Sequence, residues 1–515
     1  MDRLSEELQK YSRSDAYPFH MPGHKRRGNP LFAADITEID GFDNLHDPQG
    51  ILLEEMHFAS AFYQTEETYF SVNGSTCCLL AAISAAVPRG GRLMLERSAH
   101  ISVYHAADLR NLELLYIDGP GVSPPPESAP AQKKPDAVLI TSPTYEGCVK
   151  DLRPWAAYAR KQNIPLIVDE AHGAHFSMHP YFPESAIRLG ADLVIQSTHK
   201  TLPAMTQTAL LHNVTGRVSG HKLQRYLDIY ETSSPSYVLL SSVTSAIHQC
   251  FEHGDRFFGE YVSRLRSLRS SLSKLKQLRL LGGAEAIISS DSEFPPFAAG
   301  TSVDPGKLVI LCRNLLSGSE LYDILRGRYQ LQPEMKAPDY CLLMTSVSDT
   351  DEGFERLQNA LFEIDSLPEP GINSFPYSAA ACSDRLHLKQ NNVTSKPAFS
   401  SKSGPKAALP PVRMRISEAS EAACELLPLK EAAGRIAADY ICVYPPDTPL
   451  FVPGEEITEQ AILRINELLA AGLSVTGLSS LPADDSQHTE SGAVLSSPAL
   501  PDSSGPVLCI RCLQV

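Results

Sequence analysis

The feature of this sequence that most restricts its fold is the alternation of short apolar runs with helix-length segments between residues 50 and 250. Near-continuous apolar strands that alternate with helices are typical of a parallel or mixed sheet with helices on both faces. The sequence therefore predicts an α/β fold built on a large, mostly parallel sheet. The runs expected to form its strands are TYFSV, RLMLE, LELLYID, DAVLITS, IPLIVDE, ADLVIQS and TALLH.

The chain is expected to divide into six units, one of which is the large domain that contains this sheet. They are an N-terminal arm, a large domain, a small α/β domain, a linker, a C-terminal α+β unit and a low-complexity tail, with boundaries at 1–50, 51–290, 291–366, 367–412, 413–478 and 479–515. The linker is rich in Pro, Ser, Ala and Lys, and the tail has too few apolar residues to be expected to add to a core. Further strands are expected at KLVILC and YCLLMTS, and helices over 1–17, 255–282 and 350–365.

Composition excludes several classes of function for this chain. Its 515 residues carry a formal net charge of −15, which argues against nucleic acid as a partner. No apolar run is long enough to span a membrane, and the charged N-terminus does not resemble a secretory signal. The 11 cysteines show no disulfide framework, so a cytoplasmic protein with reduced thiols is expected. The lone C-x-x-C at 509–512 has no second pair and no nearby His, so no metal site is expected there.

The first candidate site follows the strand YFSV, where the chain continues as Asn73, Gly74, Ser75 and Thr76 and then enters an apolar helix. Glycine lets the backbone approach a ligand, hydroxyls donate hydrogen bonds, and the helix N-terminus offers free N–H groups. This arrangement suits an anion, most simply a phosphate. The alternative is an ordinary helix cap, which Ser or Thr supplies in many helices.

A second group of polar residues follows the strand IPLIVD. Asp169 and Glu170 end the strand, and His172 and His175 follow shortly after. Four such side chains raise the possibility of a metal site, but a strand end followed by a loop does not set the two histidines on one helix face. A capped turn without a ligand is the remaining alternative.

The third and fourth groups contain a lysine and a histidine. Lys200 follows the apolar strand ADLVIQ within the segment Ser197-Thr198-His199-Lys200, and His100 opens a helix after the strand RLMLE. A lysine at a strand end is usually a solvated loop residue, and only its combination with the other groups favours a function.

Together, these groups match the needs of pyridoxal phosphate. Its phosphate needs N–H and hydroxyl donors, its ring nitrogen needs a carboxylate, and its aldehyde needs a lysine amine. Open parallel sheets bind ligands at the carboxyl ends of their strands, which is where these groups are expected. Asp169 precedes Lys200 by 31 residues (200 − 169), enough for one helix and one strand.

Seven segments carry a resemblance to a known family. They are HMPGHKRR, TEIDGFDNLHDPQGIL, VNGST, IVDEAHGAHF, QSTHKTLPAMTQTALLH, TSSPSYVLLSS and YPPDTPLFVPGE. Over about 17–478 the chain resembles the bacterial ornithine/lysine/arginine decarboxylases, which are pyridoxal phosphate enzymes of the aspartate-aminotransferase fold. It looks like the short form without an N-terminal wing domain. The resemblance implies a homodimer or larger oligomer and a small basic amino acid as substrate.

The resemblance also implies roles for individual residues. Lys200 resembles the Schiff-base lysine, Asp169 the partner of the ring nitrogen and His100 the histidine that stacks on the ring. The other residues that the resemblance places around the cofactor are Ser75, Thr76, Thr144, His172, Ser197 and His199, with His172 and His199 also counted as catalytic candidates.

Two departures from the family pattern concern the choice of substrate. After the stacking histidine the family usually has Lys-Ser, whereas this chain has Ile101-Ser102, and YPPGIP is replaced by YPPDTP with Asp447 and Thr448. We expect arginine decarboxylation to agmatine, with lysine and ornithine as alternative substrates. Another reaction of the same fold, a transamination or an aldol cleavage, and a catalytically silent regulatory paralogue stay open as alternatives.

Overall fold

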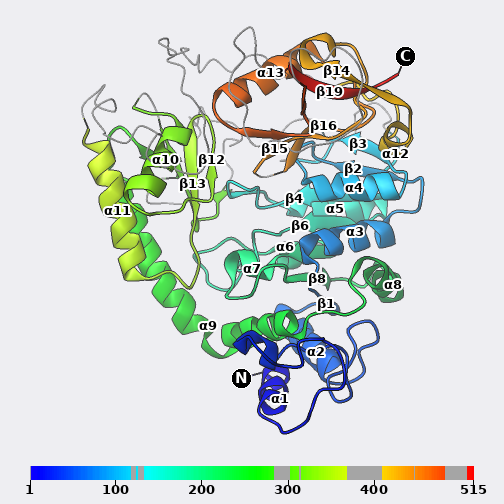
Figure 1. Cartoon of the computed structure of the whole chain (residues 1–515), viewed down its shortest axis with the longest axis vertical. Coiled ribbons are helices and arrows are strands. Elements are labelled where there is room, and N and C mark those ends of the chain that lie inside the picture. The colour runs from blue at the N-terminus through cyan, green and yellow to red at the C-terminus, as the bar shows by residue number, and fades with distance from the viewer. Residues whose placement is uncertain are drawn as a thin grey trace.

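A computed structural model of the chain describes residues 2–117, 123–125, 133–282, 302–312, 315–367, 409–445, 447–481 and 507–514. Its centre is a seven-stranded sheet of order β1-β8-β7-β6-β4-β2-β3 (Figure 1). The strands are β1 (Glu67–Ser71), β2 (Arg92–Leu95), β3 (Glu113–Tyr116), β4 (Ala137–Thr141), β6 (Leu166–Asp169), β7 (Leu193–Gln196) and β8 (Ala209–Asn213). Only β8 runs antiparallel to its neighbours, so the expected α/β fold with a large, mostly parallel sheet is confirmed.

Helices cover both faces of this sheet, as the apolar strands require. Buried side chains of α3 (Gly74–Ala86), α4 (Ile101–Leu109) and α8 (Gly220–Tyr230) pack on one face. On the other face lie α1 (Arg3–Ser12), α2 (Ile51–Tyr63), α5 (Arg153–Gln162), α6 (Ala186–Leu189) and the first part of α9 (Tyr237–Leu272). A short 3-10 helix, η1 (Pro30–Ala33), lies in the N-terminal arm.

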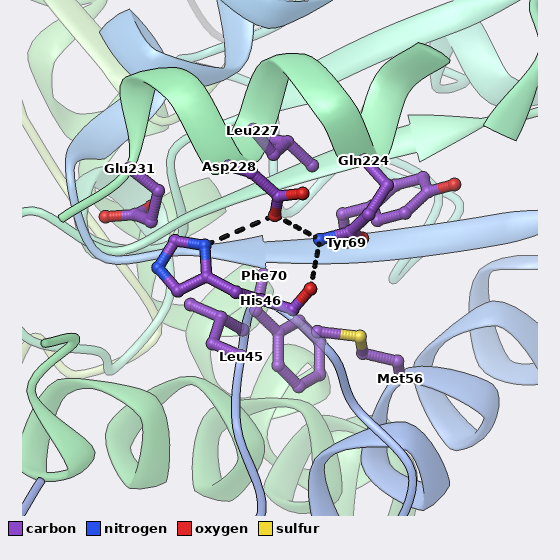
Figure 2. Close-up of a pocket in the computed structure, with 9 residues that line it drawn as sticks. All are labelled: Leu45, His46, Met56, Tyr69, Phe70, Gln224, Leu227, Asp228 and Glu231. Atoms are coloured by element: carbon purple, nitrogen blue, oxygen red, sulfur yellow. Dashed lines mark hydrogen bonds and ion pairs between the residues drawn. The ribbon is translucent and has the colours of Figure 1, made fainter. Parts of the chain in front are cut away.

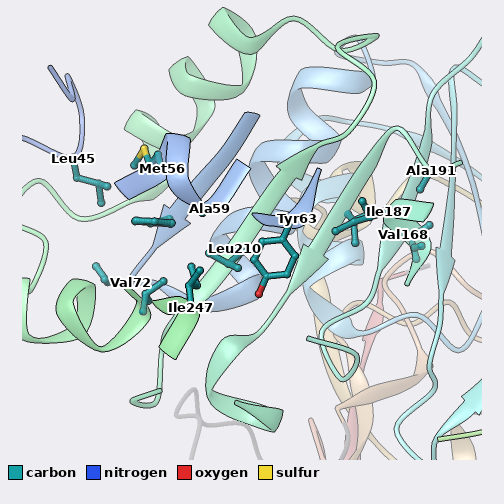
Figure 3. Packing of buried hydrophobic residues seen from close by; sticks show 14 of the residues in the cluster. Leu45, Met56, Ala59, Tyr63, Val72, Val168, Ile187, Ala191, Leu210 and Ile247 are labelled. Atoms are coloured by element: carbon teal, nitrogen blue, oxygen red, sulfur yellow. The ribbon is translucent and has the colours of Figure 1, made fainter. Parts of the chain in front are cut away.

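The core between α2, α9 and the sheet is shown in Figure 3. Met56 and Ala59 of α2, Leu210 of β8 and Ile247 of α9 belong to one cluster of buried side chains. Burying a side chain of this size contributes about 1.5–3 kcal/mol, so the cluster fixes the sheet against its helices. This rigid sheet positions the segments that follow its strands.

A smaller α/β unit follows α9, whose far half packs against it. Its sheet has the order β12-β13-β11-β9, and α10 and α11 cover it. The elements are β9 (Arg279–Leu280), β11 (Lys307–Leu311), α10 (Gly318–Arg328), β12 (Met335–Lys336), β13 (Tyr340–Met344) and α11 (Asp351–Asp365). A two-stranded ladder of β5 (Cys148–Val149) and β10 (Ser302–Val303) ties this unit to the turn after β4.

The C-terminal unit contains two three-stranded sheets, of order β14-β19-β18 and β16-β15-β17. Its elements are α12 (Ile416–Ser420), β14 (Cys424–Pro428), η4 (Leu429–Glu431), β15 (Ile441–Tyr444), β16 (Thr448–Phe451), α13 (Glu459–Ala470), β17 (Ser474–Thr476), β18 (Ser479–Leu481) and β19 (Val507–Leu513). Figure 1 shows this unit at the opposite end of the molecule from α1 and α2.

The segment 479–515 was expected to add little to a core, and this is wrong for its described strands. β19 is the central strand of its sheet, and its Ile510 and Cys512 are fully buried among the residues of the C-terminal core. The short apolar run in this segment is sufficient for a strand because it buries Cys509, Ile510, Cys512 and Leu513 and pairs with a neighbouring strand on each side. The expected linker 367–412 lies outside the described residues except at its two ends.

The helix expected over 255–282 begins and ends earlier, because α9 stops at Leu272 and the following residues lead into β9. α9 starts at Tyr237, where the side chain of Ser236 accepts a hydrogen bond from the N–H of Leu239 and caps the helix. None of the helices in the described ranges combines the length and apolarity that a membrane crossing requires.

Candidate active site

The predicted site residues follow strands whose carboxyl ends lie at one edge of the large sheet. Because β1, β2, β4, β6 and β7 are parallel, the segments after them meet at that edge. The residues in these segments are Ser75, Thr76, His100, Thr144, Asp169, His172, Ser197, His199 and Lys200.

Lys200 lies in the short helix α7 (Thr198–Thr201), directly after β7. Its Nζ lies 3.1 Å from Nε2 of His172. Burial lowers the pKa of this half-buried lysine, and the Asp169 carboxylate acts in the opposite direction. A lysine amine with a lowered pKa is more often neutral at physiological pH and therefore nucleophilic.

Asp169 is the last residue of β6 and is only 4% exposed. Burial raises the pKa of its carboxyl, while the charge of Lys200 and the N–H of Ala171, at 3.2 Å from Oδ1, act in the other direction. A buried carboxylate needs a cationic or N–H partner. A protonated pyridine ring nitrogen fits this requirement.

His100 caps α4 with its ring. Its Nδ1 accepts a hydrogen bond from the N–H of Ser102 at 3.2 Å and lies 2.8 Å from the hydroxyl of the same residue. Burial, followed by the charge of Lys200, lowers the pKa of His100 to about 4. A neutral imidazole near Lys200 suits stacking on an aromatic ring.

The loop before α3 has the form of an anion site. Gly74 has φ of +77°, and a Cβ there would meet nothing closer than the Gln207 carbonyl at 3.9 Å, so the conformation rather than crowding favours glycine. Ser75 is half-buried and Thr76 is exposed, both in the first turn of α3. Among the described residues, the buried hydroxyl of Ser197 has no hydrogen-bond partner. The unpartnered hydroxyl of Ser197 and the N-terminus of α3, a helix of 13 residues, are both suited to binding a phosphate.

Two of the predicted residues have partners within their own loops. His199 Nδ1 lies 2.9 Å from the carbonyl oxygen of Thr208, which orients the ring. Thr144 Oγ1 accepts a hydrogen bond from the N–H of Cys148 at 3.1 Å and so closes the turn after β4. These contacts position both side chains, and their contact with a ligand stays a prediction.

The side chains considered for a metal have different partners. Glu170 accepts hydrogen bonds from Ser185, from the N–H of Ala186 and from Gln196, and His175 Nε2 lies 3.1 Å from Asp304 Oδ1. His172 instead faces Lys200. Within the described ranges, no group of three or more His, Cys, Asp and Glu side chains is suited to a metal ion.

Three residues around His172 and Lys200 were not expected from the sequence. Lys307 begins β11 of the small unit and is 1% exposed, and its Nζ lies 2.8 Å from Nδ1 of His172. Tyr145, directly after the predicted Thr144, places its ring centroid 4.8 Å from that of His172 and donates a hydrogen bond to Glu334. The carboxylate of Glu334 is close enough to Lys200 to raise its pKa.

The C-terminal unit contacts the same edge of the sheet. The N–H of Ile101 donates to the carbonyl oxygen of Asp447 at 3.2 Å, so the two departures from the family pattern lie in contact. Asp447 has φ of +61°, a conformation that Asp tolerates better than most residues. The buried Glu455 pairs with Arg97 at 2.9 Å and so joins the unit to the segment after β2.

Two cavities lie away from these residues. The smaller has a volume of about 10 Å³, room for one water, and lies between α2, β1 and α8 beside His46 and Asp228 (Figure 2). The larger, about 450 Å³, lies between α2, α9 and residues 176–188. Neither is lined by any of the predicted site residues.

The chain matches two family models. The model described as Orn/Lys/Arg decarboxylase, major domain, matches residues 3–120 and 126–314, and the model described as Orn/Lys/Arg decarboxylase, C-terminal domain, matches residues 394–472. The first match alone covers more than half of the chain.

Similar proteins extend over nearly the whole chain. An uncharacterized protein, YaaO, of Bacillus subtilis (strain 168) is 31% identical, with 92% of this chain and 95% of that protein covered. An arginine decarboxylase of the same organism is 29% identical over 93% of this chain and 95% of its own length. The lysine decarboxylase LdcA of Pseudomonas aeruginosa is 22% identical over 88% of this chain and 73% of its length.

Solved structures share the fold. The Escherichia coli constitutive lysine decarboxylase superposes with a TM-score of 0.77 at 18% identity, covering 100% of this chain and 82% of that one. The Francisella novicida lysine decarboxylase LdcF gives a TM-score of 0.76, also at 18% identity, covering 100% and 81%.

Proposed function

Because the chain belongs to the Orn/Lys/Arg decarboxylase family, we propose that it decarboxylates arginine to agmatine, in the service of polyamine metabolism. Family membership establishes the coarser statement, a carboxy-lyase that acts on a basic amino acid with pyridoxal 5'-phosphate as cofactor. The preference for arginine is the part that needs support from the site and from the relatives.

Each residue at the strand ends would have a separate role in such a reaction. The bound cofactor supplies an electron sink for the pair of electrons left when CO2 departs. Lys200, whose pKa burial lowers, would offer its amine to the cofactor aldehyde, and Asp169 would hold a proton at the ring nitrogen. Ser75, Thr76 and Ser197 would hold the phosphate, and His100 would cover one face of the ring.

Decarboxylation also consumes a proton at the carbon that loses CO2. His172, His199 and Lys200 are the candidates for delivering it. His172 and Lys200 lie 3.1 Å apart, so a proton held by one is within reach of the other. Their partial or full burial keeps bulk water away from that carbon.

The observation that carries the arginine proposal is that the names of the more similar relatives agree with the carboxylates found near the site. Three relatives with 26–29% identity over at least 91% of this chain are called arginine decarboxylases, whereas the lysine and ornithine decarboxylases compared reach 22–24%. The carboxylate of Glu334 acts on the pKa of Lys200 and that of Asp447 on the pKa of His100, so two different units supply carboxylates near the site. A planar carboxylate can accept two parallel hydrogen bonds from a guanidinium, which an ammonium cannot match.

Two other carboxylates of the C-terminal unit already form ion pairs with arginines. Glu455 is fully buried and paired with Arg97, and Glu456 pairs with Arg413 at 2.5 Å. Glu334, which accepts a hydrogen bond from the neutral Tyr145 hydroxyl, and Asp447 are the carboxylates that we propose to bind the cationic end of the substrate side chain.

We also propose a homodimer or larger oligomer that acts in the cytoplasm. None of the ten cysteines within the described residues forms a disulfide, which fits a reducing compartment. The N-terminal arm carries exposed Phe19, Met21 and Leu31, which a second copy would cover.

The test is a comparison of kcat/KM for arginine, lysine and ornithine under one set of conditions, with the amine product identified. The proposal expects arginine to give the highest value. A higher value for lysine or ornithine would overturn the substrate preference and leave the family assignment intact. Formation of a keto acid or an aldehyde in place of CO2 and an amine would favour another reaction of the same fold.

A further inference from the structure

The side chain of His172 lies between two lysines that come from different units. Its Nε2 is 3.1 Å from Nζ of Lys200, and its Nδ1 is 2.8 Å from Nζ of Lys307. His172 is 7% exposed and Lys307 1% exposed. Both ring nitrogens of the histidine are therefore committed to protein partners.

The hydrogen-bonding roles in this trio follow from its charges. Burial, with the neighbouring charges of Lys307 and Lys200, keeps the pKa of His172 well below its usual value, so the ring carries one N–H. A lysine ammonium has donors and no acceptor. If Lys307 is protonated, Nδ1 must be the acceptor, and the single N–H of the ring is then on Nε2, which faces Lys200.

The surroundings of Lys307 favour its protonated form near neutral pH. Burial lowers its pKa to about 8, with a further lowering by Lys200, while Asp304, Glu334 and Glu146 oppose this. Its Nζ also lies 5.3 Å from the centroid of the Tyr145 ring.

The fold holds Lys307 in place by contacts with the turn after β4. A Cβ on Gly147, whose φ is +96°, would come within 2.7 Å of Lys307 Cγ, so the turn packs directly on the lysine stem. The N–H of Asp304 donates to the carbonyl oxygen of Gly147 at 2.8 Å. The ladder of β5 and β10 continues this contact and brings Lys307 beside a histidine 135 residues away.

We propose that Lys307 is a positioning residue that fixes the tautomer of His172, so that His172 presents an N–H to the nitrogen of Lys200 and favours its neutral form. A donor facing a nitrogen stabilises the unprotonated state of that nitrogen, and a nearby positive charge acts in the same direction. The inference rests on the proposed function only in taking Lys200 as the lysine that bonds to the cofactor. Deprotonation of Lys307 would remove the constraint on the tautomer.

The first test uses cofactor-free protein labelled with 15N in histidine. The His172 signals, assigned by their loss in His172→Gln, should show hydrogen on Nε2 and an acceptor Nδ1 at pH 7. Hydrogen on Nδ1 would overturn the inference. This measurement uses the wild-type chain, so it decides the matter even if variants of Lys307 do not fold.

The second test follows the protonation of the Lys200 nitrogen by spectroscopic pH titration of the cofactor-loaded protein without substrate. In Lys307→Met the midpoint should rise by about one pH unit, because both the N–H and the charge are lost. Lys307→Arg, which keeps a donor and a charge, should restore the wild-type midpoint, and Lys274→Met, an exposed lysine of the same unit, should leave it unchanged.

An unchanged midpoint in Lys307→Met, or an equal rise in Lys307→Arg, would contradict the inference. A purely structural role for Lys307 does not move the tautomer or the midpoint in a given direction. Neither test involves turnover, so a failure of the arginine proposal would leave both results intact.

Discussion

The floor and the rim of the candidate site are built in different ways. The floor, made of His100, Asp169, Ser197 and Lys200, comes from segments that follow neighbouring strands of one sheet. The rim, made of Glu334 and Asp447, comes from the small unit and the C-terminal unit. The floor residues can support the same reaction while the rim residues differ, because the position of the rim depends on how the other two units pack against the large sheet. Substitutions on the floor should therefore lower the rate of any substrate, and substitutions on the rim should change the preference among substrates.

The largest effect is expected from Lys200→Ala. Loss of the amine should lower kcat by more than about 10³-fold for arginine, lysine and ornithine alike. Amine production measures the effect, and thermal unfolding with retention of non-covalently bound cofactor serves as the control. Substantial turnover without an added amine would show that Lys200 is not the essential lysine.

A somewhat smaller effect on the floor is expected from Asp169→Asn. The carboxylate matters most when negative charge enters the cofactor ring, so kcat should fall by about 10²-fold while cofactor affinity changes less. Steady-state kinetics and cofactor titration separate the two. A variant with near-normal kcat would mean that another group keeps the ring nitrogen protonated.

On the rim, Glu334→Gln should raise KM for arginine by about tenfold and change kcat little. A charge-assisted hydrogen bond to the distal cation is worth about 1.5 kcal/mol or more, which corresponds to this ratio. Glu355→Gln, which removes an exposed carboxylate from α11, is the matched control. If KM stays unchanged, Glu334 does not contact the distal cation and Asp447 becomes the remaining candidate.

The smallest effect on turnover is expected from Ile510→Ala in β19. The fully buried side chain leaves a cavity, which should lower the free energy of unfolding of the C-terminal unit by about 2–5 kcal/mol. Activity should then be lost on mild heating before the floor releases its cofactor. Arg511→Ala, an exposed neighbour on the same strand, should behave as wild type. Simultaneous loss of activity and cofactor would show that floor and rim unfold together.

The floor of the site could be predicted from the sequence, whereas the residues contributed by the other units could not. The strands of the large sheet and the floor residues could be predicted because each polar group directly follows an apolar run in the chain. Lys307 was overlooked because it begins the strand KLVIL, and nothing near it in sequence shows that it contacts His172. Its only local signal is the preceding Gly306, which gives no direction to the side chain. Glu334 was missed for the same reason.

The strand pairing of the C-terminal unit also could not be predicted from the sequence. The central place of β19 in its sheet could not be predicted, since no pattern in the sequence reveals that two other strands flank it. Buried neighbours decide such a pairing, and they come from segments far apart in the chain.

The pairing of β14 with β19 has a consequence for protein synthesis. β14 ends at Pro428 and its partner β19 begins at Val507, so roughly 80 residues are added by the ribosome before the two strands can meet. At about 5–20 residues per second this takes roughly 4 to 16 s. During that time the large sheet, complete by Asn213, has its own partners and can fold, whereas β14 exposes a strand edge. The nascent chain therefore passes through a state in which the floor is formed and the last unit is open to chaperones.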